Sequence, residues 1–305
     1  MPQEIGAFFL AKRGKIWYNV EQIEKRNDMK RILTIQDISC VGKCSLTVAL
    51  PIISAMGVEA AVLPTAVLST HTAFSGFTFH DLTDEITPVT EHWKQEKIGF
   101  DAIYTGYLGS FRQLELVGKI FDDFGTQENH IVVDPVMADH GKLYHGFTEE
   151  FAASMATLCG KADLILPNLT EAAFLLGVPY EEKPDEARVK ELLVMLTDLG
   201  CKTAALTGIS LSDGKLGVMS YNSETKEYFY YAREHLPVAF HGTGDVFAST
   251  VVGAIARGRS VNEALTLAVD YTVDTICKTM EDPTHNWYGV NFESAIPSLI
   301  RALGD

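Results

Sequence analysis

Short apolar runs alternate with segments of helical periodicity along most of this chain, and no other sequence feature constrains its fold as strongly. The runs have the length of buried strands, and the segments between them have the length of helices. Strands separated by such helices form βαβ units, which predict a mostly parallel sheet with helices on both faces, a three-layer α/β/α sandwich. The expected strands are residues 31–35, 60–63, 102–104, 131–133, 164–166 and 203–206.

Polar residues, proline and glycine predict where several of the helices begin and end. Residues 45–56 are expected to form a helix that Gly57 ends, and Thr87 with Pro88 is expected to open another that ends at Gly99. Capping boxes are predicted at Ser110 with Gln113 and at Ser260 with Glu263.

The pattern changes after residue 206, where two apolar runs, 216–220 and 228–231, follow each other with only a polar stretch between them. This spacing predicts a short antiparallel edge on the sheet. Further helices are expected over 245–257, 261–279 and 292–303. No linker interrupts residues 29–305, which are expected to form a single domain. Residues 1–28 are interpreted as an N-terminal extension without an assigned role.

Acidic residues outnumber basic ones by 40 to 25, which gives a formal net charge of −15. Because phosphate backbones attract basic surfaces, this excess argues against a nucleic-acid partner. An anionic substrate would need local positive potential from backbone amides, a metal ion or a few lysines. The apolar run at residues 7–11 is too short to span a membrane, so no membrane partner is expected. Five cysteines without a C-x-x-C pair suit a cytoplasmic location.

The strongest local signal for chemistry is the sequence FHGTGDVFA at residues 240–248. Gly242 and Gly244 precede an amphipathic helix and free the backbone to turn its N–H groups, including that of Thr243, toward one point. The helix N-terminus adds partial positive charge, so the loop is predicted to form an anion hole. Beside it, Asp245 fits the base that takes the proton of an attacking hydroxyl in phosphoryl transfer. A residue merely favoured by the helix dipole is the alternative.

Two common nucleotide-binding motifs are absent from the sequence. It contains no G-x-x-x-x-G-K-[ST] segment, and no G-x-G-x-x-G follows the first expected strand. P-loop NTPases and dinucleotide-dependent oxidoreductases are therefore disfavoured.

Four motifs in a fixed order resemble those of the ribokinase-like superfamily, specifically its vitamin kinases. They are DPVMAD at residues 134–139, PNLTEA at 167–172, LTG at 206–208 and GTGD at 242–245, and the resemblance covers residues 31–279. The segments at residues 35–36, 69–72 and 105–110 are similar to pyridoxal or pyridoxamine kinases. The resemblance implies a ribokinase-like fold and ATP-dependent phosphorylation of the 5′-hydroxymethyl group of a B6 vitamer, namely pyridoxal, pyridoxamine or pyridoxine.

Asp134 and Asp139 follow the expected strand at residues 131–133 and should emerge at the functional edge of the sheet. Taken alone they also fit aspartates that cap a loop. The resemblance implies that Asp134 lies at the phosphate end of the nucleotide and Asp139 near the metal. Carboxylates suit Mg²⁺ as ligands, directly or through water.

Asn168 and Glu171 lie beyond the next expected strand, with Thr170 as the expected N-cap of a helix that Glu171 begins. A simple helix start is the alternative. In the resembled family the Asn contacts phosphate and the Glu orients metal-bound water, so both Asp139 and Glu171 are implied at the metal. Thr207 and Gly208 end another strand, and similarity places them against the ATP phosphates, although a Thr there can merely satisfy a backbone group.

Asp37, Thr72 and Tyr107 are the candidates for binding the vitamer, each at the end of an expected strand. Thr72 also fits a turn residue, and Tyr107 also fits an aromatic at the rim. Asp37 stands where pyridoxal kinases commonly carry Ser. A carboxylate there can accept a hydrogen bond from the ring N–H or pair with the amine of pyridoxamine, which favours pyridoxamine. His71 is interpreted as structural, since the mechanism already has a base.

By similarity the phosphoryl donor is ATP with Mg²⁺, a role for a monovalent cation stays open, and the protein is expected to be a homodimer. The nearest alternative is a hydroxymethylpyrimidine kinase, which shares the phosphate machinery and acts on a comparable ring hydroxymethyl group. A non-catalytic nucleotide or vitamer sensor on the same fold is a third hypothesis. The intact loop at residues 242–244 beside Asp245 argues against the sensor.

Overall fold

A nine-stranded sheet forms the centre of the protein in the computed structural model, which describes residues 29–304. The predicted extension at residues 1–28 lies outside this range. The strand order is β11-β10-β9-β8-β5-β4-β1-β2-β3, and the six strands from β9 to β2 pair in parallel. Their bounds are β1 Arg31–Ser39, β2 Glu59–Leu68, β4 Ala102–Thr105, β5 His130–Val133, β8 Leu164–Ile165 and β9 Thr203–Ile209.

Antiparallel strands close both edges of this sheet. The predicted antiparallel edge is confirmed as β10 (Lys215–Asn222) and β11 (Glu227–Glu234). On the opposite edge β3 (Phe79–Asp81) pairs antiparallel with β2, and this strand was not predicted. Its three exposed residues are too few to show an alternating pattern. A separate two-stranded hairpin, β6 (Ala138–Asp139) with β7 (Lys142–Leu143), projects after β5.

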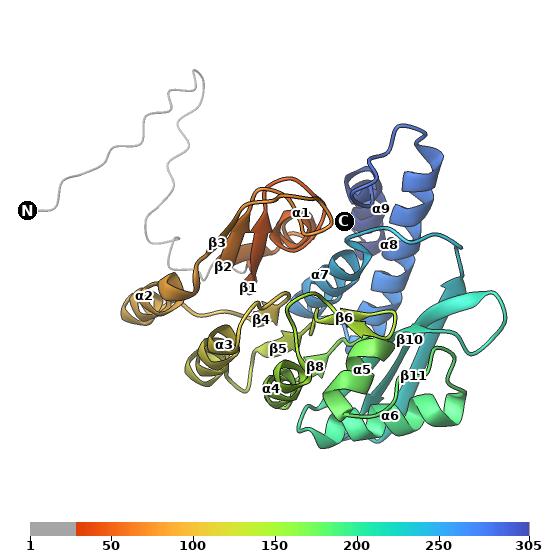
Figure 1. Ribbon diagram of the computed structural model, residues 1–305, viewed down its shortest axis with the longest axis horizontal. Helices are drawn as coiled ribbons and strands as arrows, with labels where there is room; N and C mark the ends of the chain where they lie inside the picture. Colours follow the sequence, from red (N-terminus) through yellow and green to blue (C-terminus); the bar gives the residue numbers. More distant parts are fainter. Residues whose placement is uncertain (1–28, 305) are drawn as a thin grey trace, which may run out of the picture.

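Helices cover both faces of the sheet, as the alternation predicts (Figure 1). One apolar core packs strand residues such as Ile35 and Val133 against α2 to α6, and the other packs Ile32 and Val132 against α1, α7, α8 and α9. Neighbouring strand residues enter different cores because side chains alternate across a strand. The helices are α1 Leu46–Ala55, α2 Thr83–Gln95, α3 Phe111–Phe124, α4 Glu149–Cys159, α5 Leu169–Leu176, α6 Glu186–Asp198, α7 Thr243–Ala256, α8 Val261–Glu281, the 3-10 helix η2 Phe292–Ala295 and α9 Ile296–Leu303.

Three predicted helix ends are wrong. Helix α2 begins at Thr83 rather than Thr87, because the Asp81 carboxylate accepts the backbone N–H of Thr83 at 2.9 Å and starts the helix one turn earlier. Pro88 therefore lies inside α2, and the helix ends at Gln95, well before Gly99. Helix α5 begins at Leu169, with Asn168 rather than Thr170 as its N-cap.

Of the two predicted capping boxes, the one at Ser260 and Glu263 is confirmed. At the start of α3 the Ser110 hydroxyl accepts the N–H of Gln113, but the Gln113 side chain does not return to Ser110. It accepts the N–H of Gly109 and donates to the carbonyl of Thr65 instead. The buried amide thus links α3 to β2 rather than completing the box.

No helix within residues 29–304 is both long enough and apolar enough to cross a membrane. The parallel strands all end at the same edge of the sheet. After β1 the chain adds β2 and β3 on one side of β1 and then β4 on the other side, so the strand order reverses between β1 and β4. In open α/β sheets ligands bind outside the carboxyl ends of the strands near such a reversal. A ligand site is therefore expected among the loops after β1, β4, β5, β8 and β9.

Candidate active site

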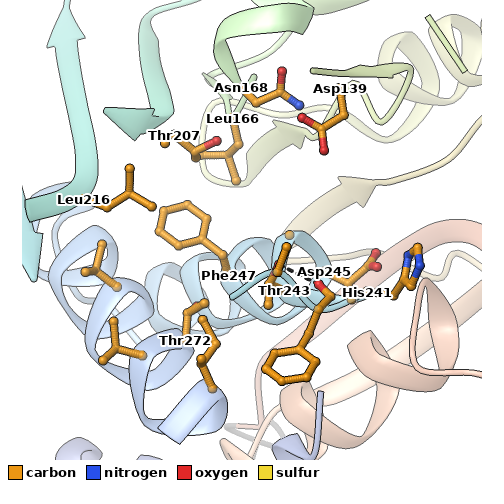
Figure 2. A pocket seen from close by; sticks show the side chains of 18 of the residues that line it. Asp139, Leu166, Asn168, Thr207, Leu216, His241, Thr243, Asp245, Phe247 and Thr272 are labelled. Carbon is orange, nitrogen blue, oxygen red and sulfur yellow. Dashed lines mark hydrogen bonds between the residues drawn. The ribbon is translucent and has the colours of Figure 1, made fainter. Parts of the chain in front are cut away.

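A cavity of about 460 Å³ opens at the carboxyl ends of β5, β8 and β9 and at the start of α7. Its volume lies within the usual range for a small-molecule site. Every residue predicted for the nucleotide end or the anion hole lines this cavity: Asp134, Asp139, Asn168, Glu171, Thr207, Gly208, Gly242, Thr243, Gly244 and Asp245. Figure 2 shows Asn168 and Asp139 on one side of it, with Thr243 and Asp245 on the other.

The glycine turn before α7 is fixed by close packing. Gly242 is the N-cap of α7 with a φ of 84°, and a Cβ added there would lie 1.9 Å from the carbonyl oxygen of Lys43. Only glycine meets both demands. A Cβ on Gly244 would meet no protein atom within 4 Å, so open space lies beside this residue in the cavity wall. The turn thus presents helix N-terminal amides to unfilled space, as an anion hole requires.

Asp245 lies in the first turn of α7, partly exposed to the cavity. The pKa of its carboxyl is raised to about 7, mainly by burial and also by the nearby carboxylate of Asp37, while the backbone N–H of Ser45 lowers it. A carboxyl with a pKa near neutrality is suited to accept and release a proton at physiological pH. The arrangement can therefore supply a general base beside an anion hole.

Backbone amides hold the buried carboxylate of Glu171. The N–H of Met137 donates to its Oε1 at 3.0 Å and the N–H of Asn168 to its Oε2 at 2.9 Å. Burial nevertheless raises the pKa of Glu171 to about 7. Asp134 is also buried, and burial followed by the charge of Glu171 raises its pKa well above the ordinary value, against the backbone N–H of Val136. Two carboxylates so placed need a cation to be ionised together.

Both the oxygen and the nitrogen of the Asn168 side-chain amide form hydrogen bonds within the protein. Its Oδ1 accepts the N–H of Glu171 at 2.9 Å in a complete capping box, and its Nδ2 donates to the carbonyl of Ala138 at 2.9 Å. One amide hydrogen remains for a ligand. Thr207 donates its hydroxyl weakly to the carbonyl of Pro167 at 3.4 Å, while Gly208 is exposed.

The three residues predicted to bind the vitamer do not line this cavity. Asp37 is 4% exposed and accepts the hydroxyl of Ser39 at 3.0 Å. Burial raises the pKa of Asp37, and its charge contributes to raising the pKa values of both Tyr107 and Asp245. Asp37 thus lies close enough to both Tyr107 and Asp245 for its charge to affect them. Thr72 is exposed.

One part of the cavity was missed by sequence reasoning. Its apolar wall contains Leu216 of β10 and the α8 residues Val269, Val273 and Ile276, beside Phe247 of α7 (Figure 2). Spacings of four and three residues place the three α8 side chains on one helix face. That periodicity was visible, but it does not distinguish a face that lines a cavity from one that packs in the core.

Mg²⁺ is the metal that the resemblance implies. Within residues 29–304 no three His, Cys, Asp or Glu side chains form a ready-made metal site. Mg²⁺ does not need one, since it usually binds one or two carboxylates together with waters and substrate phosphates. The exposed carboxylate of Asp139 and the buried carboxyls of Asp134 and Glu171 share the cavity wall. This donor set fits a magnesium ion that arrives with a nucleotide.

The fold and this constellation define a class of protein, the ATP-dependent kinases of ribokinase-like fold, with a glycine turn and several carboxyl groups at one edge of the parallel sheet. A comparison with protein families then identifies the family. Residues 49–287 match the phosphomethylpyrimidine kinase family, and the chain belongs to it.

Two solved structures and one curated relative extend this result. The chain is 40% identical to a Bacteroides thetaiotaomicron protein provisionally named a phosphomethylpyrimidine kinase and crystallised with pyridoxal, with a TM-score of 0.84 over 89% of this chain and 96% of that one. It is 31% identical to pyridoxal kinase from Lactobacillus plantarum, with a TM-score of 0.82 over 89% and 97% of the chains. Pyridoxine kinase from Bacillus subtilis is 29% identical over 65% of this chain and 71% of its own. The predicted ribokinase-like fold is confirmed.

Proposed function

We propose that this protein transfers the γ-phosphoryl group of ATP to the 5′-hydroxymethyl group of a B6 vitamer and so forms the 5′-phosphate. The observation that carries the proposal is the position of Asp245, in the first turn of α7 beside the glycine turn and near Asp37. Support also comes from relatives named pyridoxal and pyridoxine kinases and from the related structure that contains pyridoxal.

In this proposal Asp245 accepts the proton of the attacking hydroxyl. Its pKa of about 7 leaves a substantial fraction of the carboxyl ionised at neutral pH and still basic enough to take a proton. The amides of Gly242, Thr243 and Gly244 donate hydrogen bonds to the oxygens of the transferring phosphoryl group. Stabilising charge that develops in the transition state is the main task of protein groups in phosphoryl transfer.

The cavity wall at the ends of β5 and β8 would hold the nucleotide phosphates and Mg²⁺. We assign Asp134, Asn168, Thr207 and Gly208 to the phosphates, and Asp139 with Glu171 to the metal. A bound magnesium ion would neutralise phosphate charge. Because its oxygens accept backbone N–H groups, Glu171 is proposed to act through a metal-bound water.

At the acceptor end, Asp37, Thr72 and Tyr107 are proposed to bind the vitamer ring. The buried carboxylate of Asp37 would pair with the ring N–H or with the amine of pyridoxamine, which favours pyridoxamine over pyridoxal. The homodimer, the cytoplasmic location and any monovalent cation remain predictions.

A hydroxymethylpyrimidine kinase is the second candidate, favoured by the family to which the chain belongs. The test is ADP formation by the purified full chain with MgATP and, in turn, pyridoxal, pyridoxamine, pyridoxine or hydroxymethylpyrimidine. We expect kcat/KM to be highest with a B6 vitamer. A higher value with the pyrimidine would reject the B6 assignment. Binding of ATP and a vitamer without formation of a phosphate ester would instead identify a sensor.

A further inference from the structure

The cavity is strongly acidic for a site that takes a nucleotide. Five carboxyl side chains line it, and no Lys or Arg does among the residues that the structure describes. Among the cavity-lining residues that the structure describes, the basic side chains are those of His235 and His241. The five carboxyl residues are Asp134, Asp139, Glu171, Glu234 and Asp245. Phosphate oxygens at this site therefore depend on a metal ion, backbone amides and any neutral donors within reach.

His241 has the position of such a donor. It directly precedes Gly242 in the glycine turn and lines the cavity, and Figure 2 shows its ring on the same side of the cavity as Asp245. The residue is exposed, and neither ring nitrogen has a hydrogen-bond partner within residues 29–304. Both nitrogens are thus available to a bound ligand.

The backbone and a second histidine hold this ring in place. The N–H of Val290 donates to the carbonyl of His241 at 3.1 Å, and the rings of His71 and His241 lie 5.1 Å apart. His71 is itself fixed, because the N–H of Ala73 donates to its Nδ1 at 3.2 Å. Its Nε2 must then carry the proton that it donates to the carbonyl of Tyr288 at 2.9 Å. These two hydrogen bonds make His71 a rigid neighbour for the His241 ring.

Partial burial of the ring lowers the pKa of His241 from its ordinary value, so the ring is mainly neutral at pH 7 and offers one N–H. A neutral donor does not attract the proton that Asp245 must accept.

We propose that His241 donates a hydrogen bond to the γ-phosphoryl group of ATP as it passes to the acceptor, and is a further catalytic residue. The proposal rests on the phosphoryl transfer proposed above. In that step the bond between the γ-phosphorus and the β,γ-bridging oxygen breaks, and a bond between the acceptor oxygen and the γ-phosphorus forms. The hydroxyl proton passes to Asp245, and ADP leaves.

Nucleotide binding separates this role from a structural one, because ADP lacks the γ-phosphate. We would compare the wild type with His241→Leu, His241→Gln and the control His92→Leu, which changes an exposed histidine of α2. Affinities for ADP and for the β,γ-imido analogue of ATP, each with Mg²⁺, are measured by calorimetry, and kcat is measured as ADP release.

For His241→Leu we expect an unchanged Kd for ADP, a Kd for the analogue about tenfold weaker, and a kcat about 10²-fold lower. The kcat of His241→Gln, which keeps a neutral donor, should be about tenfold higher than that of His241→Leu. Equal weakening of ADP and the analogue would overturn the proposal, as would a kcat like that of the wild type or a Gln variant no better than Leu. If the wild type phosphorylates no B6 vitamer yet the ADP and analogue affinities still diverge, the proposed substrate fails and this inference stands.

Discussion

At the proposed nucleotide end of the site, backbone amides donate hydrogen bonds to the carboxylates, whereas at the proposed acceptor end side chains contact one another. Glu171 accepts the N–H groups of Met137 and Asn168, and the glycine turn offers amides of its own. Asp37 accepts the hydroxyl of Ser39, and the ring of Tyr107 lies 5.6 Å from that of Phe147.

This difference predicts how well each end of the site tolerates substitutions. Backbone amides stay in place whatever side chains surround them, so the nucleotide end tolerates change around it as long as its carboxylates and glycines remain. A side-chain contact disappears with one substitution. The acceptor end is therefore the part in which single changes can alter substrate choice.

Asp245 joins the two ends, and replacing it should have the largest effect. Asp245→Asn removes the base, so kcat should fall by at least about 10²-fold while ADP binding stays nearly intact. Steady-state ADP release and calorimetric titration with ADP measure the two quantities. Turnover like that of the wild type would remove Asp245 from its proposed role.

Substitutions at two glycines of the same turn should differ in their effect on stability. In Gly242→Ala the new methyl group would collide with the carbonyl of Lys43 at a φ of 84°, so the free energy of unfolding should fall by about 1–3 kcal/mol, and kcat with it. Gly244→Ala meets open space and should change stability by less than about 1 kcal/mol. Urea unfolding of both variants is the measurement. A Gly242 variant as stable as the Gly244 variant would contradict the close packing.

Glu171 and Asp245 both have a pKa near 7, yet neutral replacements should act on stability with opposite sign. Glu171→Gln turns an NH₂ group toward a backbone N–H, which should lower stability by about 1–2 kcal/mol. The Asp245 pKa rises from 3.8 unfolded to about 7 folded, so its ionisation removes stability as the pH increases from about 4 to 7.

Asp245→Asn should therefore raise the melting temperature above pH 7, and the gain should shrink toward pH 4. Thermal melts of both variants and the wild type between pH 4 and pH 8 check the signs. A destabilised Asp245→Asn protein at pH 8 would show that its carboxylate stabilises the fold.

The two ends of the site also differ in how well they could be predicted from the sequence. The order of strands and helices could be predicted from periodicity, and the resemblance of four motifs picked out residues that the structure brings together in one cavity wall. Strand β2 was predicted too short, since it continues through Pro64, which pairs with Gln36. Next to Pro64 the other side of β2 is unpaired within the described sheet, because β3 pairs only from Ala66 onward, so no ladder hydrogen bond is lost there.

The start of α5 shows a second limit. Thr170 and Asn168 are both good N-caps by residue type. Asn168 takes the position because Glu171 then completes a capping box and reaches the amide of Met137, a contact that depends on the tertiary fold. The contact between His71 and His241, 170 residues apart in the chain, was equally outside the reach of local patterns.

The smallest effect should come from the acceptor end, where Asp37→Ser restores the residue type common in the resembled pyridoxal kinases. Loss of a charged partner for the amine should lower kcat/KM for pyridoxamine about tenfold relative to pyridoxal, with the KM for ATP unchanged. Because the charge of Asp37 raises the pKa of Asp245, the acid limb of kcat/KM should also move to lower pH. Rates with each vitamer from pH 5 to pH 9 test both effects. If all vitamers weaken equally and the acid limb stays in place, Asp37 only supports the fold and substrate choice lies elsewhere at the acceptor end.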